Sequence, residues 1–207
     1  HLADRGLLDT EDPFTTPAAL RTLRNTIPDE AIVTTDIGGH RIWTKNTFPT
    51  YEPETFITAG SWAGMGLGLP SAIGARLARP DRPVFTFTGD GSLLMCSQEL
   101  HTAVEYGLDL TVVLFNDADY GIISKSPKLK GMKGENQFGW TSPDWVSLAE
   151  AYGCCGCQVD TREDLRERIQ WSMDTDGPVL LDVAIDQTEP SPFETAAYET
   201  DVDVSSF

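Results

Sequence analysis

Residues 83–92 read Pro83-Val84-Phe85-Thr86-Phe87-Thr88-Gly89-Asp90-Gly91-Ser92, a short apolar run that passes directly into an aspartate between two glycines. The run over 83–88 is rich in β-branched and aromatic residues and has the length of a buried strand. The glycines after it predict a tight turn. Residues 92–106 then predict a helix, so the segment starts a strand–helix–strand unit.

The same alternation of strand and helix continues on both sides of this segment. Further buried strands are predicted over 31–36, 110–115 and 178–185. Further helices are predicted over 17–26, over 72–78 after a Gly-rich entrance that starts at residue 65, over 144–152 and over 162–173. Strands that alternate with helices build a parallel sheet covered on both faces. We therefore predict an α/β fold with a doubly wound, mostly parallel sheet, in which residues 120–142 form a long loop of functional type.

The 207 residues suit a single large domain with two flanking segments. We expect a linker or remnant of a preceding domain over 1–15, the α/β domain over 16–186, and an acidic tail over 187–207. The formal charge of −17 argues against binding to nucleic acid or to an anionic membrane. Since no apolar run reaches the roughly 20 residues of a membrane span, we expect a cytoplasmic protein. The dispersed acidity fits a protein adapted to high salt as well as an ordinary acidic one.

Two further patterns could suggest other chemistry. Cys154, Cys155 and Cys157 lie close together, but the histidines are scattered and no second pair follows at zinc-site spacing. Small residues at the start of a buried strand explain this cluster better than a metal does. The segment Gly64-Met65-Gly66-Leu67-Gly68 suggests a dinucleotide site, but it lacks the last glycine of the Gly-x-Gly-x-x-Gly pattern.

Two acidic turns follow neighbouring strands. One is Gly89-Asp90-Gly91-Ser92, and the other is Asn116-Asp117-Ala118-Asp119. Because one helix separates the two strands, both turns should lie side by side beyond the carboxyl ends of the strands, where such sheets bind ligands. Asp90 and Asp117 would then offer oxygen ligands to a hard cation such as Mg²⁺. The N–H groups of Gly91 and Ser92, at a helix start, favour a phosphate. The alternative is that Asp90 only forms the turn and that Asp117 is a solvated loop residue.

The spacing of these turns decides between the two interpretations. Gly89-Asp90-Gly91, followed 27 positions after Asp90 by Asp117 in an Asn-Asp pair, resembles the cofactor motif of thiamine-diphosphate-dependent enzymes. The chain is most similar to the C-terminal, diphosphate-binding domain of acetolactate synthase large subunits. The resemblance implies thiamine diphosphate and Mg²⁺, with Asp90, Asp117 and the backbone carbonyl of Asp119 as metal ligands. The family has Asn at the position of Asp117, so this chain carries an additional negative charge there.

Two companion segments extend the resemblance. The segment from Asp36 to Trp43 is similar to a family loop that contacts the diphosphate, and the segment from Ala59 to Gly74 is similar to one that cradles the aminopyrimidine ring. In the second segment Met65 would be the catalytic wedge that bends the cofactor, although a lone Met is also a common core residue. The implied cofactor-binding residues are Ile37, Gly38, Gly39, His40, Ala63, Met65, Gly89, Asp90, Gly91, Ser92, Asp117, Asp119 and Tyr120. Of these, His40 could equally be a structural hydrogen-bonding residue.

The resemblance implies a thiamine-diphosphate-dependent 2-oxo acid lyase or transferase of the acetolactate synthase type, which decarboxylates and ligates its substrates. Family members complete their site with a pyrimidine-binding domain of the same or another chain, and they are typically homo-oligomers. Ser126 stands where acetolactate synthases usually carry Trp, which keeps a simple 2-oxo acid decarboxylase subunit as an alternative. A non-catalytic assembly or regulatory domain is the alternative of another class. Whether FAD is bound elsewhere is left open.

Overall fold

Six strands are found in the computed structural model, which describes residues 14–125 and 138–190. They are β1 (Ile32–Thr35), β2 (Phe56–Thr58), β3 (Val84–Gly89), β4 (Thr111–Asn116), β5 (Cys155–Val159) and β6 (Val179–Ala184). They form one sheet in the order β2-β1-β3-β4-β6-β5, and every neighbouring pair is parallel. The predicted α/β fold with a parallel sheet is therefore confirmed.

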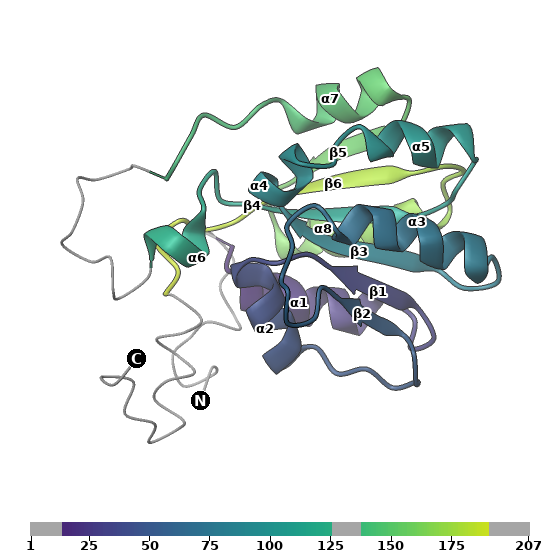
Figure 1. The fold of residues 1–207 in the computed structure, drawn as a ribbon, viewed down its shortest axis with the longest axis horizontal. Coiled ribbons are helices and arrows are strands. Elements are labelled where there is room, and N and C mark those ends of the chain that lie inside the picture. Colours follow the sequence, from purple (N-terminus) through teal and green to yellow (C-terminus); the bar gives the residue numbers. More distant parts are fainter. Residues whose placement is uncertain (1–13, 126–137, 191–207) are drawn as a thin grey trace.

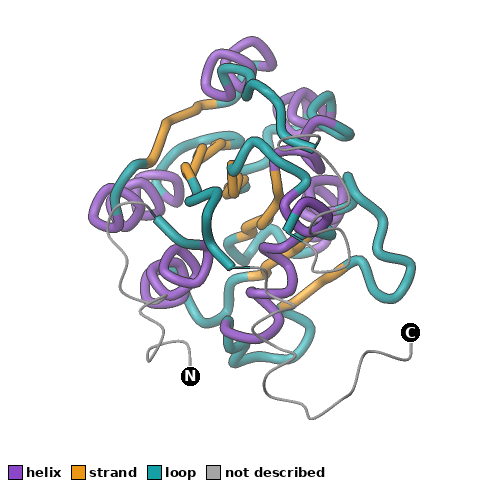
Figure 2. Tube along the Cα trace, turned by 90° about the vertical axis from the view of Figure 1, so that its left-hand side faces the viewer, coloured by secondary structure: helices purple, strands orange, loops and turns teal. Residues whose placement is uncertain are grey.

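Helices cover both faces of this sheet. One face packs against α1 (Thr16–Thr26), α2 (Gly39–Thr47) and α8 (Arg162–Met173), and the other against α3 (Gly68–Ala78), α5 (Glu99–Glu105) and α7 (Trp145–Tyr152) (Figure 1). Figure 2 shows the strands in the middle of the molecule with helices on either side. Two short helices, α4 (Asp90–Leu94) and α6 (Gly121–Ser124), lie beyond the ends of β3 and β4.

Strand β4 illustrates why both faces need a cover. Val113 and Phe115 belong to the apolar cluster that includes α1, α2 and α8, whereas Val112 and Leu114 belong to the cluster that includes α3, α5 and α7. All four side chains are buried. Successive side chains of a strand point to opposite faces, so a strand that is apolar at each position is stable only between two layers.

The strand order reverses between β1 and β3. The chain leaves β1 outward to β2 and then returns to place β3 on the other side of β1. Connections that leave in opposite directions open a crevice at the carboxyl ends of the two strands, and parallel α/β sheets bind ligands in such crevices. The turn after β3, which carries Asp90, lies at this edge.

The helix predicted over 92–106 is divided in the structure. Between α4 and α5, the backbone N–H groups of Met95 and Cys96 donate to carbonyls three residues earlier, at Ser92 and Leu93. Such bonds tighten the chain into a 3₁₀ turn and end the α-helix. Cys96 is buried, as expected for a core residue, but it lies in this link and not on a helix face.

Other boundaries shift less. The helix predicted over 72–78 begins earlier, at Gly68 within the predicted Gly-rich entrance, whereas the range of α8 is as predicted. Cys155 and Cys157 lie on the edge strand β5, exposed and half-buried, so the expectation of a buried strand is wrong there. The patterns do not predict α2, β2 or α6. Much of the expected loop over 120–142, including Ser126, and most of the two flanking segments lie outside the described residues.

No helix within the described ranges is both long and apolar enough to cross a membrane.

Candidate functional site

A cavity of about 260 Å³ opens beyond the carboxyl ends of β3 and β4. It is lined by every residue of the cofactor-binding set that the sequence implies, from Ile37 to Tyr120. These residues come from four separate stretches of the chain. Three of the stretches follow β1, β3 and β4, which are neighbours in the sheet, and the fourth is the Met65 segment before α3. The parallel sheet thus gathers the predicted residues into one place.

The turn after β3 buries its aspartate in this cavity. Asp90 is only 2% exposed; its Oδ1 accepts the backbone N–H of Gly91 at 2.7 Å, and its Oδ2 has no hydrogen-bond partner. Burial, with a further contribution from the Asp117 carboxylate, raises the pKa of Asp90 to about 7. Burying a carboxylate without partners is costly, so this geometry favours a cation beside Asp90.

Gly91 is required in the same turn by close contact. A Cβ at this position would lie 2.5 Å from the Tyr120 ring, well inside van der Waals contact. The Tyr120 ring in turn packs edge-on against Trp140 at 4.7 Å between centroids. The next residue, Ser92, donates its hydroxyl to the Ile37 carbonyl at 3.2 Å, which joins the turn to the segment after β1.

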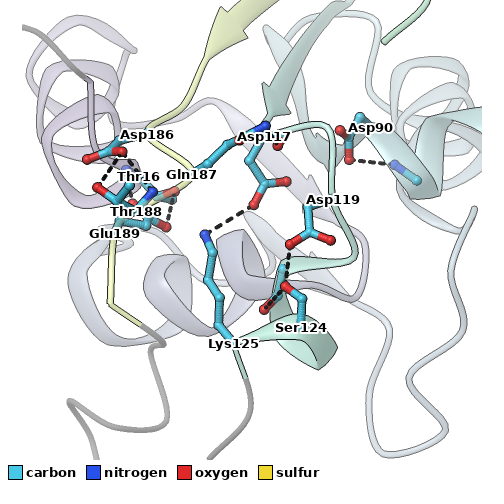
Figure 3. A network of polar contacts seen from close by, with 12 residues as sticks. Thr16, Asp90, Asp117, Asp119, Ser124, Lys125, Asp186, Gln187, Thr188 and Glu189 are labelled. Carbon is cyan, nitrogen blue, oxygen red and sulfur yellow. Dashed lines mark hydrogen bonds and ion pairs between the residues drawn. The ribbon is translucent and has the colours of Figure 1, made fainter. Parts of the chain in front are cut away.

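The turn after β4 presents two more carboxylates. Asp117 Oδ2 accepts a hydrogen bond from Lys125 Nζ at 3.3 Å (Figure 3). Asp119 Oδ2 accepts the Ser124 hydroxyl, whereas its Oδ1 is buried without a partner. Burial raises the pKa of Asp117, and the Lys125 charge partly opposes that rise. The turn itself is shaped by Ala118, whose φ of +52° is left-handed.

Asn116, which precedes Asp117, has a different role. Its Nδ2 donates to Asp182 Oδ1 on β6, and its Oδ1 accepts the Ser142 hydroxyl, both at 2.9 Å. Both bonds are made away from the Asp117–Lys125 pair. Asn116 therefore fixes the end of β4 to its neighbours, and the second residue of the Asn-Asp pair is the one that reaches the cavity.

Asp36 organises the segment that carries Met65. Its Oδ1 accepts the backbone N–H groups of Leu67 and Gly68 at 2.6 and 2.9 Å, and its Oδ2 accepts the Thr88 hydroxyl at 2.8 Å. This buried carboxylate ties the 63–68 segment to the ends of β1 and β3. Although Asp36 lies in a segment that the resemblance identifies, the sequence assigns it no role.

The Met65 segment has an unusual backbone. Ala63 adopts a φ of +54°, a left-handed conformation that disfavours any residue with a Cβ. Both Ala63 and Met65 line the cavity. A glycine would adopt this backbone conformation without that penalty.

His40 is held as a neutral ring against the core. Its ring stacks on Phe115 at 5.8 Å between centroids, and burial lowers its pKa to about 3. Its Nε2 is buried without a hydrogen-bond partner. A neutral imidazole at the edge of the cavity offers one polar atom to a ligand without adding charge.

Sequence reasoning missed part of the lining. The additional lining residues are Thr16, Phe115, Gly121, Ile122, Ile123, Lys125, Ile185 and Glu189. Glu189 is 8% exposed, and its two carboxylate oxygens accept the backbone N–H of Thr16 at 2.7 Å and the Thr16 hydroxyl at 2.8 Å (Figure 3). No local pattern distinguishes this glutamate from its acidic neighbours in the sequence.

The cavity fits a magnesium diphosphate group. Asp90 Oδ2 and Asp119 Oδ1 are buried oxygens without partners, and Asp117 lies beside them in the same cavity. Among the described residues, no group of three or more His, Cys, Asp or Glu side chains is arranged to hold a metal ion alone. Mg²⁺ typically takes one or two carboxylates and completes its shell with phosphate oxygens and water. The donor set therefore suits an ion that is shared with a phosphorylated ligand.

Comparison with known proteins identifies the family of this fold. Residues 36–183 match the family described as thiamine pyrophosphate enzyme, C-terminal TPP binding domain. The acetolactate synthase isozyme 1 large subunit of Escherichia coli is 36% identical over 181 residues, which are 86% of this chain and 32% of that protein. The acetolactate synthase of Bacillus subtilis is 33% identical over 82% of this chain and 30% of that protein.

A solved structure agrees with these relatives. The benzoylformate decarboxylase of Polynucleobacter necessarius aligns with a TM-score of 0.80 and 26% identity, over 86% of this chain and 34% of that one. The chain thus spans about a third of the length of the proteins it matches. By its sequence match, its sheet and its cavity, the chain belongs to the thiamine pyrophosphate enzyme family, as a C-terminal TPP-binding domain.

Proposed function

We propose that this chain binds thiamine diphosphate and Mg²⁺ as part of a 2-oxo acid lyase or synthase of the acetolactate synthase type. The observation that carries the proposal is the buried, unpartnered oxygen of Asp90 in a cavity that Asp117 also lines. Family membership supports thiamine diphosphate as the cofactor. The relatives at 33–36% identity that are named acetolactate synthases favour synthase chemistry over simple decarboxylation.

Different residues around the cavity would bind the metal ion and the diphosphate. Asp90, Asp117 and the backbone carbonyl of Asp119 would hold the metal ion, and the segment from Ile37 to His40 with the turn from Gly89 to Ser92 would surround the diphosphate. Tyr120 packs against Gly91 and closes the side of this turn. The cavity thus offers oxygen ligands at one point and mostly apolar walls elsewhere.

Met65 and Ala63 would position the cofactor ring. Both line the cavity, and Asp36 fixes the segment that follows them through two backbone hydrogen bonds. When bound, thiamine diphosphate supplies a carbanion that attacks a 2-oxo acid and an electron sink for its decarboxylation. The protein's contribution is to hold Met65 as an apolar support and to present the Ala63 carbonyl to the ring.

The site would need a second domain. The chain spans about a third of its relatives, and family members pair this domain with a pyrimidine-binding one. We infer that the α/β domain over 16–186 completes its active site with a pyrimidine-binding domain of the same or another chain, in a homo-oligomer. A purified chain that decarboxylated 2-oxo acids at ordinary enzymatic rates by itself would contradict this part of the proposal.

The cofactor assignment is tested by calorimetry on the purified chain. Thiamine diphosphate is titrated in Mg²⁺ and again in EDTA, with NAD as a control ligand for the dinucleotide-binding alternative. We expect heat of binding for thiamine diphosphate in Mg²⁺ only. Binding that persists in EDTA, or binding of NAD, would reject the metal–diphosphate site, and binding of neither ligand would favour a non-catalytic assembly domain.

A further inference from the structure

Lys125 lies inside the cluster of acidic side chains that lines the cavity. Its Nζ is 3.3 Å from Asp117 Oδ2, and the two side chains are 17% and 19% exposed (Figure 3). Such a pair is largely withdrawn from water, so its electrostatic interaction is stronger than that of a surface ion pair. Among the described lining residues, Lys125 is the one that carries a permanent positive charge.

The backbone is built to hold this pair. Gly121, the first residue of α6, passes so close that a Cβ there would lie 2.6 Å from Asp117 Oδ2 and 3.5 Å from Lys125 Nζ. Lys125 is the C-cap residue of the one-turn helix α6, and its backbone N–H donates to the Gly121 carbonyl at 3.0 Å. The position of the ammonium therefore follows from the fold of the turn after β4.

Acidic side chains outnumber basic ones around Lys125. The carboxyl side chains that line the cavity are Asp90, Asp117, Asp119 and Glu189. Asp117 is an additional carboxylate here, because the family pattern has a neutral Asn. Lys125 also acts electrostatically on Glu189, which lines the same cavity. The ammonium thus has a second carboxylate within its field if it loses Asp117.

We propose that Lys125 is a resident counter-cation of the metal site, which holds Asp117 in the metal-free protein and is displaced from Asp117 by a divalent cation. The inference rests on the proposed function, since it needs a metal at Asp117. An ammonium and a divalent ion at the same carboxylate repel each other. Metal binding at Asp117 therefore favours breaking the Asp117–Lys125 contact, and Lys125 weakens the affinity for the free ion.

The test uses Mn²⁺ alone as the probe, because its free concentration is read directly by electron paramagnetic resonance. We expect Lys125→Met to bind Mn²⁺ about tenfold more tightly than the wild-type chain, since a unit charge near a divalent ion opposes it. Lys125→Arg, which keeps the charge, should stay near the wild-type affinity. Lys45→Met on α2 is the matched control, because it removes the same charge from an exposed residue outside the cavity.

A second measurement separates the proposal from a purely structural role. Without metal, Lys125→Met should unfold at a lower temperature than the wild-type chain, because Asp117 then lacks its partner, and Mn²⁺ should raise that temperature more than in the wild type. A residue that only supports the loop would lower both the stability and the Mn²⁺ affinity. Equal or weaker Mn²⁺ binding by Lys125→Met therefore overturns the inference.

If Lys125→Met does not fold, the effect of Lys125 is measured in a protein that also lacks the Asp117 carboxylate. Asp117→Asn combined with Lys125→Met buries no unpaired charge from the pair, and it should bind Mn²⁺ more tightly than Asp117→Asn alone. The opposite order overturns the inference. A wild-type chain that binds Mn²⁺ neither alone nor with thiamine diphosphate would instead reject the proposed function, and the role of Lys125 with it.

Discussion

The two edges of the sheet each carry a cavity, and the cavities differ in chemistry far more than in size. The cavity at the carboxyl edge measures about 260 Å³, and one at the amino edge measures about 220 Å³. The amino-edge cavity is lined by Arg76, Arg82 and Asp109, whose charges are paired within the protein. Arg76 contacts Asp109 at 2.9 Å, and Arg82 contacts Glu52 at 2.6 Å.

The carboxyl edge leaves comparable groups unpaired. Oxygens of Asp90 and Asp119 and a nitrogen of His40 are buried there without partners, whereas Asp109 at the amino edge also accepts the Gly177 N–H at 2.7 Å. Buried polar atoms are normally satisfied, so a cluster of exceptions in one cavity favours that cavity as the proposed ligand site. Unsatisfied polarity, and not volume, distinguishes the two cavities.

The largest expected effect comes from removing one carboxylate at each edge. Asp90→Asn should weaken binding of thiamine diphosphate in Mg²⁺ by at least about 100-fold, because the metal loses a charged ligand. Asp109→Asn should leave binding within about twofold, since it alters a partly exposed ion pair and a backbone hydrogen bond at the opposite edge of the sheet. Calorimetry on both variants checks the contrast. Equal losses at the two positions would remove the distinction between the edges.

Substitution by alanine should have opposite effects at a glycine in close contact with other atoms and at a glycine in open space. Gly91→Ala should weaken cofactor binding by roughly 10- to 100-fold, because the new Cβ displaces Tyr120 and overpacking typically costs about 1–3 kcal/mol. Gly74→Ala on α3 meets no atom within 4 Å and should raise stability by about 0.5–1 kcal/mol. Thermal unfolding and calorimetry of both variants measure the two effects. A Gly91→Ala protein that binds normally would show that the turn is not crowded.

His40 should give the carboxyl edge a distinct response to acid. The pKa of His40 is lowered in the folded protein to about 3. The neutral ring therefore contributes its full stabilisation above the ordinary pKa of 6.5, and this stabilisation is progressively lost as the pH falls from 6.5 toward 3. Between pH 6.5 and 5 the wild-type chain should lose about 2 kcal/mol more than His40→Gln does. Urea unfolding at both pH values measures this difference. The control is His101→Gln, which replaces an exposed histidine and should keep the wild-type response.

The smallest effect concerns the left-handed backbone of the Met65 segment. Ala63→Gly should raise the stability by about 1 kcal/mol, because glycine tolerates the φ of +54° that penalises a Cβ. Denaturant unfolding of the metal-free protein reports it. A loss of stability would mean that the Ala63 methyl contributes packing that outweighs the backbone strain.

The sequence predicts the central strands well because they are buried on both faces and rich in apolar and β-branched residues. The ranges given for β3 and β4 are within one residue at each end, since a strand buried on both faces has a composition that few other structures share. The edge strand β2 has three residues that are half-buried or exposed, so no apolar run marks it. Helix α2 begins at the second of two consecutive glycines, Gly38 and Gly39, which usually indicate a loop.

The residues of the candidate site are likewise predictable from the sequence only in part. The residues of the two turns and of the Met65 segment are recognisable because short motifs with fixed spacing place them at strand ends. Lys125 and Glu189 reach the cavity through contacts that depend on how a loop and a terminal segment return to the sheet. Such contacts leave no periodic signal in the sequence, so only the folded structure reveals them.

The contact between Thr16 and Glu189 also bears on the order of folding. It joins residues 173 positions apart and ties the segment after β6 to the start of α1. Bringing such distant parts together costs loop-closure entropy, which is lower once the intervening sheet has formed. We expect this wall of the cavity to assemble at the end of folding. Ligand binding at the site would then measure the fully folded protein only, whereas a measurement of helix content would also include partly folded intermediates.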